Sequence, residues 1–138
     1  MDIPLGKKIK KRQHYEVGLL QDELVDIIYS IENGLVMHGG TAIWRCYKGN
    51  RFSEDLDFYC KNVSKIDEEL ETKLRQHGLK LLKFKKTENL IFSKIKSTTA
   101  EVRAEVNFSK QIKPTAMPFE KVDGSFSSIL TLTPEELL

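Results

Sequence analysis

The sequence has 138 residues, of which 40% are hydrophobic and 30% are charged, a balance typical of one globular domain. Its 22 Lys and Arg against 20 Asp and Glu leave a formal charge of +2, too small a bias to indicate nucleic-acid binding from bulk electrostatics. No apolar stretch approaches the ~20 residues that span a bilayer, and no apolar signal region follows the basic N-terminus. We therefore expect one core and a cytoplasmic location.

A basic run, GKKIKKR, occupies residues 6–12. It contains one apolar residue and no amphipathic partner positions, so two interpretations stay open: a solvated, partly disordered arm, or an arm that binds the phosphates of an RNA substrate. The sequence does not separate them. We divide the chain into a basic N-terminal arm, residues 1–13, and one domain, residues 14–138.

The first half of the domain is predicted to contain a helix, a strand and a second helix. From residue 15 to 32 apolar side chains recur at three- and four-residue steps, which indicates an amphipathic helix, and Asn33-Gly34 would end it. Residues 35–37 form a short apolar run, typical of a buried strand that breaks at the glycines after it. The second helix would begin at Thr41, since a hydroxyl residue after glycines is a favourable N-cap.

The second half is predicted to be mainly β-structure. Residues 56–60 indicate a strand, and residues 64–77 indicate a helix with Ser64 as its N-cap. β-Rich segments follow at residues 79–85, 89–96 and 101–108.

The last part of the chain is predicted to be irregular and then helical. Residues 111–128 contain prolines and a glycine and show no clear period. The final TLTPEELL, residues 131–138, has the cap, the first-position proline and the acidic first turn of a helix that should continue.

The two cysteines, Cys46 and Cys60, have apolar or aromatic neighbours in sequence. They show neither CxxC spacing nor a histidine at metal-ligand distance, so a zinc site is not expected. We interpret both as small core residues.

The stretch at residues 38–59, HGGTAIWRCYKGNRFSEDLDFY, is the most informative. Asp55 and Asp57 are two apart in a predicted strand, so both carboxylates point to one face while Leu56 and Phe58 point to the other. Like charges held that close need a compensating cation, and hard oxygen ligands suit Mg²⁺. A solvated Asp-x-Asp on an exposed strand is the plain alternative.

The glycines before this strand favour the metal-binding interpretation over the solvated alternative. Gly39-Gly40-Thr41 lies at a predicted strand-to-helix junction, where missing side chains and free N–H groups let a phosphate approach the backbone. A Gly-Gly pair alone is more often a plain turn. The combination of strand, Gly-Gly-Thr, helix and Asp-x-Asp is much rarer.

A third carboxylate is available at Glu105. Along residues 101–108 the apolar side chains alternate with Arg103, Glu105 and Asn107, so Glu105 lies on the face away from the core. The alternative is an ordinary surface glutamate on a half-exposed strand.

These residues resemble the nucleotidyltransferase superfamily. More closely, GGTAIWR followed by RFSEDLDF is similar to the AbiEii/AbiGii toxin family, over roughly residues 15–138. The resemblance implies an α/β (α+β) fold, a nucleotidyltransferase-like mixed β-sheet with helices packed on one face. It assigns the nucleotide triphosphate to Gly39, Gly40 and Thr41, with Arg51 and Ser53 beside the phosphates, and metal binding and catalysis to Asp55, Asp57 and Glu105.

The implied function is transfer of a nucleoside monophosphate from an NTP, such as ATP or GTP, to an acceptor hydroxyl, with Mg²⁺ or Mn²⁺ as cofactor. The resemblance implies an RNA acceptor, such as a tRNA end, or a protein hydroxyl, in a toxin system countered by an antitoxin protein. A catalytically silent nucleotide-binding or protein-interaction module with the same fold is the alternative. Trp44 and Tyr47 could stack on a base, although burial in the core is the usual fate of such a tryptophan.

The family pattern is incomplete here. In such family members a segment resembling TLTPEELL leads into a helix with a lysine and then an Arg-Asp-containing motif that help to hold the nucleotide. This sequence stops at Leu138, before either. We therefore expect a shortened form, a gene fragment or a minimal variant, with weak nucleotide binding or no activity in isolation.

Overall fold

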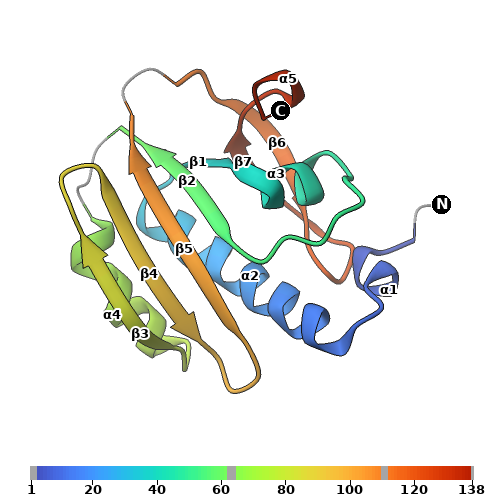
Figure 1. Ribbon diagram of the computed structural model, residues 1–138, viewed down its shortest axis with the longest axis horizontal. Coiled ribbons are helices and arrows are strands. Elements are labelled where there is room, and N and C mark those ends of the chain that lie inside the picture. The colour runs from blue at the N-terminus through green and yellow to red at the C-terminus, as the bar shows by residue number, and fades with distance from the viewer. Residues whose placement is uncertain (1–2, 62–64, 110–111, 138) are drawn as a thin grey trace.

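A seven-stranded mixed β-sheet organises the chain (Figure 1). The computed structural model describes residues 3–61, 65–109 and 112–137. The strands are β1 (Val36–His38), β2 (Leu56–Cys60), β3 (Lys80–Lys86), β4 (Leu90–Lys96), β5 (Glu101–Phe108), β6 (Thr115–Glu120) and β7 (Phe126–Thr131). The helices are α1 (Leu5–Lys8), α2 (Arg12–Ile31), α3 (Gly39–Cys46), α4 (Ile66–Gln76) and α5 (Pro134–Leu137).

The strand order is β3-β4-β5-β2-β1-β7-β6. At the centre, β2 runs parallel to β5 and antiparallel to β1, and β1 runs parallel to β7. An antiparallel meander of β3, β4 and β5 forms one side of the sheet, and the β6–β7 hairpin forms the other. Parallel pairing between β2 and β5 places two strands that are far apart in sequence side by side.

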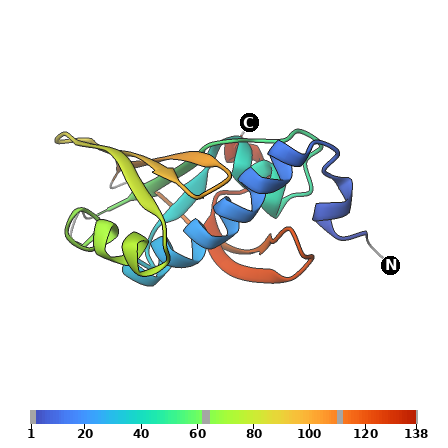
Figure 2. The ribbon, with the colours of Figure 1, turned by 90° about the horizontal axis from the view of Figure 1, so that it is seen from below.

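One face of the sheet is covered by α2 and α4, which contact each other and the strands (Figure 2). Alternation along the strands supplies that face with apolar side chains: Leu56 and Phe58 are fully buried, and most even-numbered residues of β5 are buried. The predicted mixed α/β fold with helices on one face is confirmed. None of the helices in the described part of the chain is long and apolar enough to cross a membrane.

Most predicted elements are confirmed with small shifts. α2 begins three residues earlier than expected, at Arg12, and β2 has the predicted bounds. The β-rich segments after α4 form β3, β4 and β5 within one residue of the prediction. Cys46, Cys60 and Trp44 are buried, as expected. Ser64, the predicted N-cap of α4, lies outside the described residues.

The prediction of irregular structure at residues 111–128 was wrong, because β6 and the start of β7 lie there. The prolines that suggested a loop are compatible with the sheet: β6 is an edge strand, so Pro118 costs no ladder hydrogen bond on its open side. Gly124 has φ +89° in the hairpin turn, where Lys121 N–H donates to Ser125 O over 2.8 Å. The glycine does mark a turn, and this turn joins the strands β6 and β7.

The prediction that Thr41 caps the second helix was also wrong. α3 begins at Gly39, with His38 as the N-cap residue. The hydroxyl of Thr41 is engaged instead with the segment before β2. At the other end of the chain, the start signals in TLTPEELL do form a helix. Thr133 N–H and Oγ1 donate to the Glu136 carboxylate over 3.0 and 2.8 Å, and the first of these bonds is one half of a capping box.

Part of the basic arm packs on the domain. Leu5 is buried, and Gly6 N–H donates to Val122 O over 2.8 Å. A Cβ at Gly6 would lie 2.7 Å from Val122 O, so only glycine allows this approach. Residues 5–8 are therefore held against the β6–β7 hairpin.

Candidate active site

Three acidic residues lie near one another on the sheet face opposite α2 and α4. Asp57 is paired with Glu105 across the parallel β2–β5 ladder and with His38 across β1–β2. Since Leu56 and Phe58 take the core face, Asp57 lies on the open face, where it is half-buried. Asp55 lies two residues before Asp57, at the entry to β2. The structure therefore brings Glu105 beside the Asp55/Asp57 pair.

Burial and neighbouring charge both act on Asp57. Burial is the larger cause, and together with the negative charges of Glu105 and Asp55 it raises the pKa of Asp57 to about 6. His38, its neighbour on β1, stacks on Tyr59 with ring centroids 3.8 Å apart, and burial lowers the pKa of His38. A neutral imidazole cannot offset the negative charge of the carboxylates at neutral pH, so this part of the site favours binding of a cation.

Asp55 has a cationic neighbour of its own. Arg103 Nε lies 3.5 Å from Asp55 Oδ1, and both side chains are about half exposed. Within the described ranges, no three His, Cys, Asp or Glu side chains converge as a ready-made metal cluster. The donor set of hard carboxylate oxygens fits Mg²⁺ or Mn²⁺, but Asp55 would have to turn from Arg103 to join Asp57.

The raised pKa of Asp57 predicts a pH-dependent stability in the absence of metal. Folded Asp57 keeps its proton up to about pH 6, whereas an unfolded aspartate loses it near pH 3.8. The folded state then binds more protons, so its contribution to the free energy of unfolding should fall as pH rises from 4 to 6. After allowance for solvent screening, we expect a loss of about 1 kcal/mol.

Asp57→Asn should remove this loss, so the metal-free variant should be as stable as the wild type, or more stable, at pH 7. Urea titrations in EDTA at pH 4, 5, 6 and 7 would measure it. Glu88→Gln, at an exposed position between β3 and β4, is the control. A large loss of stability in Asp57→Asn at pH 7 would mean that Asp57 has a structural partner.

Gly39 lies directly against this carboxylate. Its φ is +80°, in the left-handed region that favours glycine. A Cβ at Gly39 would lie 2.8 Å from Asp57 Oδ2. The turn that begins α3 and the acidic strand β2 are therefore in contact, and a side chain at Gly39 would require the Asp57 carboxylate to shift as well as a strained backbone.

Gly39→Ala is expected to cost about 2–3 kcal/mol of unfolding free energy, of which ~1 kcal/mol is backbone strain and the rest contact with Asp57. Gly78→Ala is a matched control, since Gly78 has φ +72° but no atom within 4 Å of its would-be Cβ. Chemical denaturation of both variants would separate strain from contact. Equal losses would contradict the close approach between Gly39 and Asp57.

The loop before β2 contacts the start of α3. The Thr41 and Ser53 hydroxyls are hydrogen-bonded at 2.8 Å, and Thr41 Oγ1 also donates to Asp55 O. Thr41 is fully buried, so it holds the loop rather than facing a ligand. Gly40, Ser53 and the exposed Arg51 line a cavity of about 470 Å³, so three of the residues predicted to bind nucleotide do lie together.

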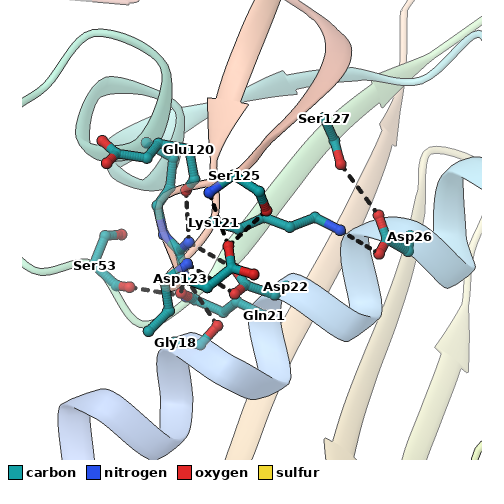
Figure 3. Close-up of polar contacts among 12 residues, drawn as sticks. Gly18, Gln21, Asp22, Asp26, Ser53, Glu120, Lys121, Asp123, Ser125 and Ser127 are labelled. Carbon is teal, nitrogen blue, oxygen red and sulfur yellow. Dashed lines mark hydrogen bonds and ion pairs between the residues drawn. The ribbon is translucent and has the colours of Figure 1, made fainter. Parts of the chain in front are cut away.

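A buried polar network supports this loop from the other side (Figure 3). Gln21, fully buried on α2, donates through Nε2 to Ser53 O and Glu54 O, both over 2.9 Å. Its Oε1 accepts from Arg45 Nη2 over 3.0 Å. Gln21 therefore joins α2, α3 and the residues that precede Asp55.

Arg45 is the hub of the network. Its side chain is 0% exposed, and Nη1 donates to Asp22 Oδ1 over 2.7 Å and to Glu120 O over 2.9 Å. Nη2 also donates to Gly18 O over 3.0 Å. The guanidinium carbon lies 4.4 Å from the centre of the Trp44 ring.

Sequence reasoning gave Gln21 and Arg45 no role. A signal existed for Gln21, which lies at a helical step from Val17 and Leu24 and so within the apolar stripe of α2. A polar residue inside such a stripe indicates a buried hydrogen-bonding partner.

A protein-family model described as "Nucleotidyl transferase AbiEii toxin, Type IV TA system" matches residues 24–138. The chain belongs to the AbiEii toxin family. The match supports nucleotidyl transfer at the level of the family. α1 and the first half of α2, with Gln21, precede the matched region.

Two solved structures share the fold. One is JHP933 from Helicobacter pylori, 19% identical, with a TM-score of 0.63 over 94% of this chain and 56% of that one. The other, from the same bacterium, is classed provisionally as a nucleotidyltransferase; it is 20% identical, with a TM-score of 0.59 over 93% of this chain and 57% of that one. The chain thus spans just over half the length of these proteins. Among curated proteins, none matches the sequence significantly.

Proposed function

We propose that this AbiEii family chain transfers a nucleoside monophosphate from an NTP to an acceptor hydroxyl, on RNA such as a tRNA end or on protein, as a toxin countered by an antitoxin. The observation that carries the proposal is the contact of Asp57 with Gly39 on one side and its pairing with Glu105 on the other. It joins a phosphate-compatible turn to a cluster of acids. ATP and GTP are the first substrates to test.

The start of α3 and the loop before β2 would hold the triphosphate. Backbone N–H groups at the start of an eight-residue helix carry partial positive charge, and Gly40 presents them without a side chain. Ser53 Oγ and the Arg51 guanidinium line the same cavity and can add donors to phosphate oxygens. Thr41 acts through Ser53, whose hydroxyl it contacts.

The acids would act on the other side of the α-phosphate. Asp57, Asp55 and Glu105 are the residues that would hold Mg²⁺ or Mn²⁺, which when bound would neutralise phosphate charge and favour ionisation of the acceptor hydroxyl. Glu105 is our candidate for the group that accepts the hydroxyl proton. The acceptor oxygen forms a bond to the α-phosphorus, the bond to the bridging oxygen breaks, and pyrophosphate leaves.

Incubation of the protein with each α-labelled NTP, Mg²⁺ or Mn²⁺, and either total RNA or a protein extract tests the proposal. We expect metal-dependent label on one class of acceptor and a loss of about a hundredfold or more in Asp57→Asn, equivalent to ~2.7 kcal/mol of barrier. Glu101→Gln, on the same open face of β5, controls for loss of one negative charge.

Label that does not depend on Asp57 would contradict the proposal. Metal-dependent NTP binding without transfer would favour the alternative, a silent nucleotide-binding module, for which the Asp55–Arg103 ion pair is the supporting observation.

A further inference from the structure

A second cavity, of about 210 Å³, lies between the N-terminal segment and the loop that follows α3. One wall is formed by His14 and four residues of the N-terminal segment, and the other by four residues of the loop: Leu5, Lys8, Ile9 and Lys10, and Lys48, Gly49, Asn50 and Phe52. Gly49, Asn50 and Phe52 line both this cavity and the one at the candidate nucleotide turn. The two cavities are therefore neighbours that share one loop.

Positive charge dominates the lining. Lys8, Lys10 and Lys48 contribute three ammonium groups, and Glu120 contributes the single carboxylate among the lining residues. Lys8 and Lys10 are exposed and make no ion pair with any residue in the described part of the chain. Lys8 and Lys10, which line one cavity and have no ion-pair partner among the described residues, favour an anion there.

The volume of the cavity and the aromatic rings that line it indicate which kind of anion it would hold. Phe52 stacks on His14, with centroids 3.7 Å apart and planes within 2°, and it also contacts the edge of Trp44. Trp44 is 5% exposed, so the rings form a packed floor rather than a free surface for a base. The cavity is also smaller than the roughly 300–1,000 Å³ of sites for whole small-molecule ligands. It suits a phosphate group.

The arm is held in place to form this wall. Leu5 is buried in the cavity lining, and the hydrogen bond from Gly6 to Val122 fixes the backbone two residues before Lys8. Lys7 and Lys11 belong to the same basic run but do not line the cavity. Two of the four lysines of the basic run therefore line the cavity, and two do not.

We propose that this cavity is an anion subsite that binds a phosphate group, either from the polyphosphate of a nucleotide or from a phosphodiester of a nucleic acid. It adds to the proposed function a second point of phosphate contact beside the candidate nucleotide turn. Binding there requires neither a metal ion nor the acids of β2 and β5.

Titration with sodium pyrophosphate and, separately, with a short single-stranded oligoribonucleotide, both in EDTA, tests the proposal. Trp44 is the one tryptophan of the chain and lines the cavity, so its fluorescence reports occupancy. Lys8→Gln/Lys10→Gln should weaken binding at least tenfold. Lys7→Gln/Lys11→Gln removes the same charge from the same arm and should change it less than twofold. Glu120→Gln should strengthen binding a few-fold.

The two titrations distinguish the two sources of the phosphate group. Tight binding of pyrophosphate assigns a nucleotide polyphosphate, and binding of the oligoribonucleotide alone assigns a phosphodiester. Equal losses in the two lysine pairs, or no saturable change with either probe, would overturn the subsite. Because EDTA removes the metal, failure here leaves the transfer reaction untouched, and failure of transfer leaves the subsite standing.

Discussion

Replacing Arg45 with methionine is expected to lower the free energy of unfolding by about 3–5 kcal/mol, the usual cost of breaking a buried ion pair by removal of one partner. The loss follows from the ion pair and the hydrogen bonds that the guanidinium makes. The Asp22 side chain, which is 14% exposed, would keep its charge without its cation, and the carbonyls of Gly18 and Glu120 would each lose the hydrogen bond from Arg45. Methionine fills much of the volume, so the loss would report the polar contacts rather than a cavity.

Arg75→Met is the matched control. Arg75 also makes an ion pair, with Glu71, but both side chains are more than 60% exposed, and such pairs contribute about 0–1 kcal/mol. Urea unfolding of both variants, with the wild type, would measure the difference. A loss below about 1.5 kcal/mol for Arg45→Met would show that water replaces the guanidinium and that the network is dispensable.

The Arg45–Asp22 ion pair fixes the relative positions of the helices more clearly than it adds net stability. Burial raises the pKa of Asp22 and lowers the pKa of Arg45, although each partner opposes the shift in the other. Desolvation is therefore the larger effect for both groups. What the pair secures is position: it ties α3 to α2 and to the end of β6 while α3 holds the glycine turn against Asp57.

Local sequence patterns predicted the parts of the candidate site but not their meeting. The spacing of Asp55 and Asp57 and the alternation along β5 each follow from the period of a strand. Their proximity to Glu105 depends on parallel pairing of β2 with β5, strands separated by 40 residues that include α4 and two further strands. The family resemblance supplied this link, since no local spacing encodes it.

The errors arose where a local signal had more than one structural solution. Proline and glycine at residues 114–124 suggested a loop, but an edge strand and a tight hairpin satisfy the same constraints. Thr41 has the chemistry of an N-cap, but the acceptor that it finds is a carbonyl at the entry to β2. In both cases tertiary pairing outcompeted the local preference.

Gln21→Glu should show how the candidate site depends on α2. The new carboxylate can still accept from Arg45, but it cannot donate to Ser53 O and Glu54 O, so we expect about 2–4 kcal/mol lost from two carbonyls without donors. Hydrogen exchange should rise first at residues 51–55. Affinity for a metal–NTP complex should fall about tenfold. Gln76→Glu, exposed at the end of α4, makes the same chemical change elsewhere and should alter neither quantity. If Gln21→Glu lost stability while exchange in this loop and NTP affinity stayed at wild-type values, Gln21 would be a packing residue of α2 without influence on the strand that carries Asp55 and Asp57.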